Sequence, residues 1–91
     1  MPPPGQLTVK VTVKLYATLA DYLPSGARNN RIEVDVAESA TVDAILRAFL
    51  LPPKLTHLVL VNGKYIAPEQ RATHVLQPDD VLAIWPPIAG G

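Results

Sequence analysis

The chain has 91 residues, of which 48% are hydrophobic, and its eight Lys and Arg residues balance its eight Asp and Glu residues. This length supports one hydrophobic core and therefore one domain. No apolar run is long enough to cross a bilayer, so we expect a cytoplasmic protein with no membrane partner. The zero net charge and the lack of a basic and aromatic cluster argue against a nucleic-acid partner.

Cysteine is absent from the sequence, which excludes disulfides, thiolate metal sites and cysteine nucleophiles. His57 and His74 lack the paired spacing of a metal motif, so no metal site is expected. Residues 1–6 hold three consecutive prolines and little to bury, so they are predicted to be a disordered lead-in. We expect the folded domain to span residues 7–85.

Two segments in the first half of the chain alternate apolar and polar residues, which is typical of half-buried strands. They are residues 7–15 and 31–36, and we expect them to pair as a long hairpin. The connection between them, residues 17–30, is too long for a tight turn, and Leu19, Tyr22 and Leu23 suggest a helical turn that Pro24-Ser25-Gly26 breaks. The residues of the first strand that should face the core are Leu7, Val9, Val11, Val13 and Leu15.

Residues 39–50 predict a helix, because apolar residues recur there at helical spacing: Val42, Ile45, Leu46 and Phe49. Thr41 can cap the first amides. Asp43 lies in the first turn, where the helix dipole favours a negative charge. We expect Pro52-Pro53 to end the helix.

Residues 57–61 are nearly continuous in apolar β-formers, which favours a central strand covered on at least part of both faces. Asn62-Gly63 supplies the residues of a two-residue hairpin turn. The turn leads to a short return strand predicted at residues 64–67.

Residues 68–80 are predicted to be a loop with a short turn around Val75-Leu76 and a type I turn at 77–80. Residues 81–85 form the last predicted strand. Two hairpin-like pairs joined through one helix predict an α+β protein with a β-grasp (ubiquitin-like) fold, a mixed sheet of four to five strands packed on one main helix. A right-handed crossover then places the first and last strands side by side in the middle of the sheet.

The end of the sequence has the composition of a tail, predicted over residues 86–91. Pro86 and Pro87 cannot donate to a strand ladder, so they should end the sheet and direct the chain outward. Gly90 and Gly91 have no Cβ, so they can enter a narrow channel and leave the terminal carboxylate open to attack. Six residues at about 3.3 Å each reach roughly 20 Å.

These features resemble the MoaD/ThiS sulfur-carrier family over nearly all of residues 7–91. The matching motifs are Val61-Asn62-Gly63, the approach Leu76…Pro78-Asp79-Asp80-Val81, and the ending Ile84-Trp85-Pro86-Pro87-Ile88-Ala89-Gly90-Gly91. The proline pair is more similar to MoaD, the small subunit of molybdopterin synthase, than to ThiS. Asp79 departs from the family pattern, which commonly has glycine there.

The resemblance implies that an E1-like adenylyltransferase of the MoeB/ThiF type uses ATP and Mg²⁺ to adenylate the carboxylate of Gly91. A sulfur donor protein would then give a C-terminal thiocarboxylate, and the tail would insert into the MoaE-type large subunit of molybdopterin synthase for molybdenum cofactor synthesis. The chain itself would bind no cofactor and supply no catalytic side chain. Gly91 and Gly90 would carry the chemistry, and the partner-binding residues would be Trp85, Pro86, Pro87, Ile88 and Ala89.

Several alternatives stay open from the sequence. Trp85 fits either an exposed docking patch or the core. The sulfur acceptor fits thiamine or tRNA, as for carriers similar to ThiS or to the ubiquitin-related modifier. An activated Gly91 also fits a protein modifier that forms an isopeptide bond to lysine, and a β-grasp interaction module with an inert terminus is the remaining alternative.

Overall fold

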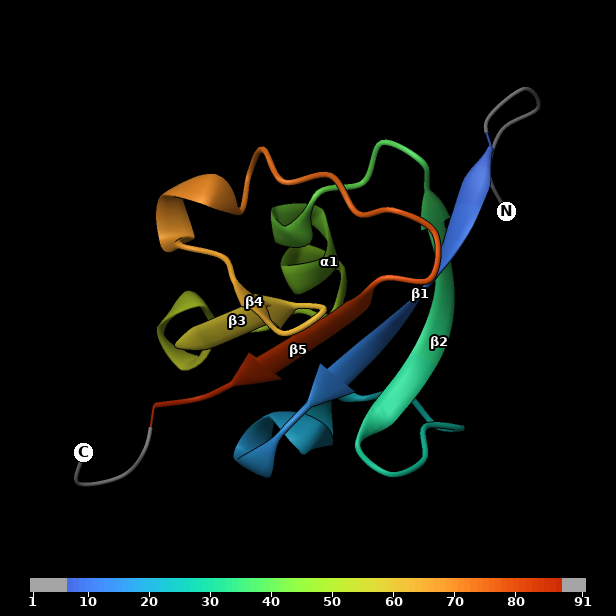
Figure 1. Ribbon diagram of the computed structural model, residues 1–91. Helices are drawn as coiled ribbons and strands as arrows, with labels where there is room; N and C mark the ends of the chain where they lie inside the picture. The colour runs from blue at the N-terminus through green and yellow to red at the C-terminus, as the bar shows by residue number, and fades with distance from the viewer. Residues whose placement is uncertain (1–6, 88–91) are drawn as a thin grey trace.

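A computed structural model describes residues 7–87 as a mixed five-stranded sheet with one short α-helix packed on it (Figure 1). The elements in chain order are β1 (Thr8–Leu15), η1 (Ala17–Tyr22), β2 (Arg31–Ala37), α1 (Val42–Ala48), η2 (Pro53–Leu55), β3 (Leu58–Val61), β4 (Lys64–Tyr65), η3 (Pro68–Gln70) and β5 (Val81–Trp85), where η marks a 3₁₀ turn. The predicted lead-in at residues 1–6 lies outside the described residues.

The strand order is β2-β1-β5-β3-β4. β1 and β5 pair in parallel at the centre, and the other three pairs are antiparallel. The first and last strands therefore lie side by side, as predicted, and the β-grasp prediction is confirmed. β5 is a central strand, and its C-terminal end lies at one edge of the molecule (Figure 1).

The hairpin of β1 and β2 has the predicted alternation, with one exception at its start. Val11, Val13 and Leu15 are fully buried. Leu7 is 65% exposed, so its predicted place in the core is wrong. The reason is that β5 begins to pair with β1 only at Thr12, so no central strand lies beside the first residues of β1.

The core lies between the sheet and α1. β2 contributes only partly buried side chains to it. The buried residues come from β1, η1, α1, β3, β5 and the loops between elements: Val11, Val13, Leu15, Leu19, Val42, Ile45, Leu46, Leu51, Val59, Val61, Ile66, Leu76, Leu82 and Ile84. Thr41 caps α1 as predicted, because its Oγ1 accepts a hydrogen bond of 3.2 Å from the Ala44 amide. The helix is therefore fixed both by its cap and by its buried face.

The end of α1 differs from the prediction, because the helix stops at Ala48, before the two prolines. Leu50 adopts a positive φ of 57°, its amide donates to the Arg47 carbonyl, and the Leu51 amide donates to the Leu46 carbonyl, both at 3.0 Å. These two bonds form a Schellman motif, in which glycine is usual at the position that Leu50 occupies. Leu50 is also 80% exposed. The left-handed turn therefore ends the helix, and the two prolines only follow it.

Replacing Leu50 by glycine is expected to raise the free energy of unfolding by about 1 kcal/mol, because glycine adopts positive φ without the steric cost that a leucine bears. Urea denaturation measures the change. Ala48→Gly is the matched control, since Ala48 is exposed in the last helical turn, and it should lower the free energy of unfolding by about 1 kcal/mol. Equal destabilisation by both substitutions would contradict the steric cost of the positive φ at Leu50.

Residues 68–80 are more ordered than the predicted loop. η3 begins at Pro68, and the predicted turn at Val75-Leu76 is wrong, since Val75 is extended and forms a bridge with Thr41. The Val42 amide donates to the His74 carbonyl at 3.0 Å, which ties this segment to the start of α1. The return strand β4 is also shorter than predicted and ends at Tyr65.

The turn at 77–80 has the predicted hydrogen bond, 3.1 Å from the Asp80 amide to the Gln77 carbonyl. Its type differs, because Asp79 has a φ of 67°, which a type II turn requires at its third residue and a type I turn does not allow. No helix among residues 7–87 is long and apolar enough to span a membrane.

Candidate functional site

The sheet ends at Trp85, the last residue of β5. The Trp85 carbonyl accepts a hydrogen bond of 3.0 Å from the His57 amide, and the Ile84 carbonyl accepts one of 3.1 Å from the Tyr16 amide. The strand is thus held from both neighbours up to its final residue. Pro86 has no amide hydrogen to continue the ladder, and Pro87 is exposed. The point at which the chain leaves the domain is therefore fixed by backbone bonds.

The Trp85 ring stacks on the Tyr16 ring, with centroids 4.3 Å apart and an angle of 1° between the planes. Both residues are half-buried. Such a pair contributes about 0.5–1.5 kcal/mol beyond its buried area. Trp85 is thus outside the buried core, and its ring forms part of a surface beside the tail exit; its predicted role in partner binding stays a prediction.

A row of neighbouring residues crosses the face of the sheet that is turned away from α1. Arg31 pairs with Lys14, Lys14 with Ala83, Ala83 with Leu60, and Leu60 with Tyr65. Trp85 continues this face toward the tail, since it pairs with Leu58. We call the apolar part of this face, formed by Tyr16, Leu58, Leu60, Tyr65, Ala83 and Trp85, the outer patch.

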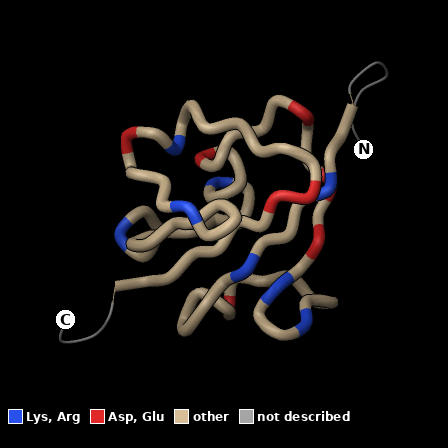
Figure 2. Tube along the Cα trace, viewed as in Figure 1, with Lys and Arg blue, Asp and Glu red and all other residues tan. Residues whose placement is uncertain are grey.

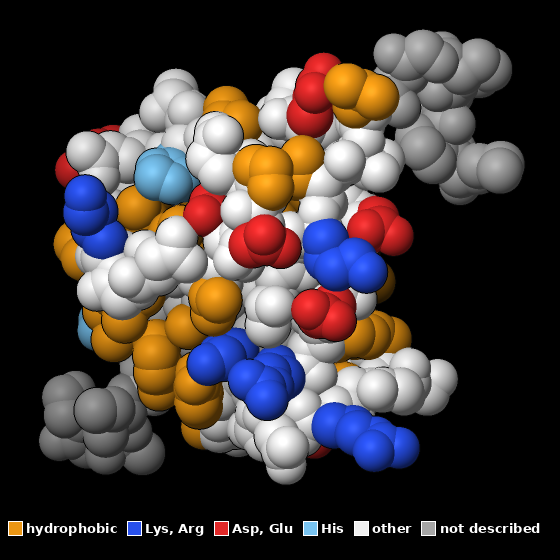
Figure 3. All heavy atoms as spheres, turned by 45° about the vertical axis from the view of Figure 1, so that its right-hand side comes forward, with side chains coloured by type: hydrophobic (Ala, Val, Ile, Leu, Met, Phe, Trp, Pro, Cys, Tyr) orange, Lys and Arg blue, Asp and Glu red, His pale blue; other side chains and the backbone are white. Residues whose placement is uncertain are grey.

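The outer patch was not predicted, although the sequence carried a signal for it. The run at 57–61 was predicted to be a central strand covered on at least part of both faces, and this agrees with the structure, in which Val59 is fully buried and Leu58 and Leu60 are half-buried on the open face. Tyr65 is 53% exposed. Hydrophobic side chains gather over the lower half of the molecule in Figure 3, next to Lys and Arg side chains. The patch thus has one exposed and four half-buried apolar side chains around the buried Ala83, and protein interfaces have a similarly apolar centre.

Positive charge adjoins the outer patch on its β2 side. Lys14 and Arg31 face each other across β1 and β2, an arrangement that costs energy because like charges lie opposite. Arg28 lies beside them, since it exchanges two backbone hydrogen bonds of 3.0 Å with Arg31. In Figure 2, blue residues mark this end of the hairpin and red residues lie farther along it. The outer patch thus has a basic border near the tail exit.

The structure leaves parts of the predicted site outside its range. Ile88, Ala89, Gly90 and Gly91 lie beyond the described residues. Among residues 7–87, no group of three or more His, Asp or Glu side chains is arranged to hold a metal ion. What the structure does bring together is the tail exit, the stacked pair of Tyr16 and Trp85, and the outer patch.

Comparisons with known proteins place this architecture in a family. The model of the ThiS family matches residues 13–91, so the chain belongs to the ThiS family, a family of ubiquitin-like sulfur carriers. Membership implies an E1-like activating partner. No curated protein sequence matches the chain.

Solved structures with the same fold cover nearly the whole chain. The Haloferax volcanii HVO 2177 protein is 25% identical, with a TM-score of 0.72 over 92% of this chain and 88% of its own. Small archaeal modifier protein 1 of Haloferax volcanii is 29% identical, with a TM-score of 0.62 over 90% of this chain and 99% of its own. A putative molybdopterin converting factor subunit 1 of Pyrococcus furiosus is 21% identical, with a TM-score of 0.64 over 88% and 99%, which supports the fold alone.

Proposed function

We propose that this protein is the sulfur carrier for molybdopterin synthesis, and that its Gly91 carboxylate is adenylated by an E1-like enzyme and converted to a thiocarboxylate. The observation that carries the proposal is the family match, which extends through the Pro86-Pro87 pair to Gly91. The fold supports it, because β5 is held up to Trp85 and Pro86, which has no amide hydrogen, cannot donate to the ladder. The proline pair favours the MoaD-type role over the ThiS-type role.

The proposed reaction needs a partner for every chemical step. The Gly91 carboxylate attacks the α-phosphorus of ATP, pyrophosphate leaves, and the carboxylate gains a good leaving group in AMP. A hydrosulfide equivalent from the sulfur donor then displaces AMP and leaves the thiocarboxylate. Transfer of that sulfur to a pterin precursor, followed by attack of water on the acyl carbon of Gly91, restores the carboxylate. This chain contributes position and an unhindered terminus, while the partner supplies the charge stabilisation.

The outer patch and its basic border would dock the activating partner. An apolar centre with a charged border is the usual composition of such surfaces. Docking on this face would place the partner beside the tail exit, because Trp85 belongs to both. A complementary partner surface is therefore apolar in its middle and acidic opposite Lys14 and Arg31.

Reversing the charge of the border is expected to slow association with the activating partner about tenfold at low salt, since electrostatic steering acts on the rate of encounter. The variant is Lys14→Glu, measured by stopped-flow fluorescence across a salt series. The control is the double variant Thr8→Glu/Gln77→Glu. It changes the net charge by the same amount as Lys14→Glu, but near the other end of β1. Equal slowing by both variants, or none by Lys14→Glu, would argue against docking on this face.

The test of the proposed function is the intact mass of the protein after incubation with an E1-like partner, ATP, Mg²⁺ and a sulfur source. Exchange of oxygen for sulfur should add about 16 Da. The partner must first be shown to thiolate its own carrier. An unchanged mass with that competent partner contradicts the proposal. Rescue of a strain that lacks its molybdopterin synthase small subunit would assign the acceptor; rescue of a thiamine or tRNA-thiolation defect alone would assign another pathway.

A second candidate function is protein modification, favoured by the likeness to small archaeal modifier protein 1, at 29% identity. The same activated Gly91 would then form an amide bond with a lysine Nζ of another protein. Adducts that survive thiols and disappear when Gly91 is deleted would support this function. Their absence from cells in which thiocarboxylate is found would leave sulfur transfer as the sole role.

A further inference from the structure

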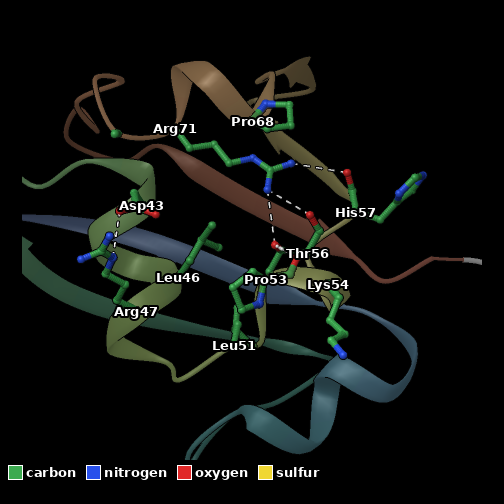
Figure 4. A pocket seen from close by; sticks show the side chains of 11 residues that line it. Asp43, Leu46, Arg47, Leu51, Pro53, Lys54, Thr56, His57, Pro68 and Arg71 are labelled. Carbon is green, nitrogen blue, oxygen red and sulfur yellow. Dashed lines mark hydrogen bonds and ion pairs between the residues drawn. The ribbon is translucent and has the colours of Figure 1, made fainter.

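A groove of about 700 Å³ lies on the helix side of the sheet, between α1 and the 3₁₀ turns η2 and η3 (Figure 4). Its walls include the apolar residues Leu46, Leu51, Pro53, Pro68 and Ala72. The outer patch lies on the opposite face of the sheet, so this groove is a separate feature. Three of its six polar side chains are Lys or Arg.

The guanidinium of Arg71 lies across this groove and is buried, with Arg71 only 8% exposed. Its Nη1 donates to the carbonyl and the Oγ1 of Thr56 at 3.0 and 3.3 Å, and its Nη2 donates to the His57 carbonyl at 3.4 Å. An arginine has five N–H donors, so these bonds leave two unused. One of them is on Nε, which is buried and has no hydrogen-bond partner among the described residues.

The charge of Arg71 is also unbalanced within the described part of the chain. All three of its acceptors are neutral, whereas a buried cation is normally paired with an anion. The groove is lined by three cations, Arg47, Lys54 and Arg71, against one carboxylate. That carboxylate, on Asp43, pairs with Arg47 at 2.9 Å. In a chain of zero net charge, this groove therefore concentrates positive charge around a donor that lacks an acceptor.

We propose that this groove is a binding site for a carboxylate on an apolar stem, with Arg71 as the residue that recognises the carboxylate. The planar guanidinium matches a carboxylate, and the second N–H of Nη2, the other unused donor, can donate to one of its oxygens. The apolar walls suit the carbon atoms that carry the acid. Lys54 at the rim adds attraction. The site is separate from the Gly91 chemistry, and only the choice of its occupant rests on the proposed function.

The structure favours an acidic side chain of a partner protein as the source of the carboxylate. His57 links the groove to the tail exit, since its carbonyl accepts from Arg71 and its amide donates to the Trp85 carbonyl. A protein that holds the tail therefore has this groove within reach. A free organic acid has the same recognising group and is the alternative source.

The test follows the Nε–H and amide resonances by NMR during titration with small probes. The probes are acetyl-Leu-Glu-Leu amide, sodium propionate and, as neutral controls, acetyl-Leu-Gln-Leu amide and propionamide, all at constant ionic strength. Saturable shifts of the Arg71 Nε–H and the Ala72 amide are expected with the two acids, at dissociation constants of about 1–10 mM, and not with the neutral probes. Tighter binding of the glutamate peptide assigns a protein source; equal binding assigns a free acid.

Two variants keep the result interpretable. Arg71→Lys retains the charge but removes the planar guanidinium, and it should abolish the saturable shift of the Ala72 amide. Because Arg71 also ties two loops together, that variant can lose stability, so Lys54→Glu provides a second test at an exposed position. It should weaken binding about fivefold or more at an unchanged thermal midpoint. No saturable shift in the wild-type protein, or equal binding to the Lys54→Glu variant, would overturn the proposal.

Discussion

Deleting Gly91 is expected to lower the rate of carrier-dependent adenylation by at least about a hundredfold, because a misplacement of about 1 Å at a reacting centre already costs that much. The deletion leaves a carboxylate on Gly90, but draws it back along the tail by about 3.3–3.6 Å. ATP–pyrophosphate exchange catalysed by the E1-like partner measures the rate. The matched control is Ala89→Gly, which keeps the tail length and should change the rate only a few-fold.

The same deletion should leave the domain intact. The buried core, the strand ladder and the stacked pair of Tyr16 and Trp85 all lie before residue 86. A thermal midpoint within about 2 °C of the wild-type value is therefore expected. Full exchange activity in the deleted chain would contradict the role of Gly91. A large fall in the midpoint would instead make the loss of activity a folding effect.

Replacing Asp80 by alanine is expected to lower the free energy of unfolding by about 2–4 kcal/mol. Asp80 is 8% exposed, and its carboxylate accepts hydrogen bonds of 2.8 Å from the Asn62 side-chain amide and from the Gln77 backbone amide. Asn62 in turn accepts from the Val81 amide at 2.8 Å. Loss of the carboxylate leaves two donors unsatisfied, each at a cost of about 1–3 kcal/mol.

Urea denaturation at an unchanged m-value measures that cost. Asp35→Ala removes an exposed carboxylate from β2 and should change stability by no more than about 0.5 kcal/mol. A double-mutant cycle with Asn62→Ala should show a coupling of about 0.5–3 kcal/mol, because the two side chains share a hydrogen bond. If Asp80→Ala is as mild as Asp35→Ala, the network does not hold the start of β5.

Most of the fold was predictable because each strand carries its own pattern. The alternation in β1 and β2 and the cap at Thr41 are local signals that tertiary packing reinforced. Apart from the exposed Leu7, the extended Val75 and the short β4, the errors arose at residues in the left-handed region, Leu50 and Asp79. There the hydrogen bonds of a helix end and of a turn override the usual preferences of leucine and aspartate, and no local pattern marks such a position.

The surroundings of the site were harder to predict than the fold. Trp85 could be assigned neither to the core nor to the surface, because its stacking partner Tyr16 is distant in sequence and meets it only through the parallel pairing of β1 and β5. The outer patch likewise depends on which face of β3 the helix covers. Such features depend on how the strands pair, so no local sequence pattern predicts them.

Fragmentation in a mass spectrometer tests most directly whether Gly91 carries the sulfur. The protein is first incubated with the E1-like partner, ATP and a sulfur source, and then recovered and fragmented. A gain of about 16 Da is expected only on fragments that contain Gly91. A gain on any fragment without Gly91, or full sulfur transfer with no modified terminus, would contradict it.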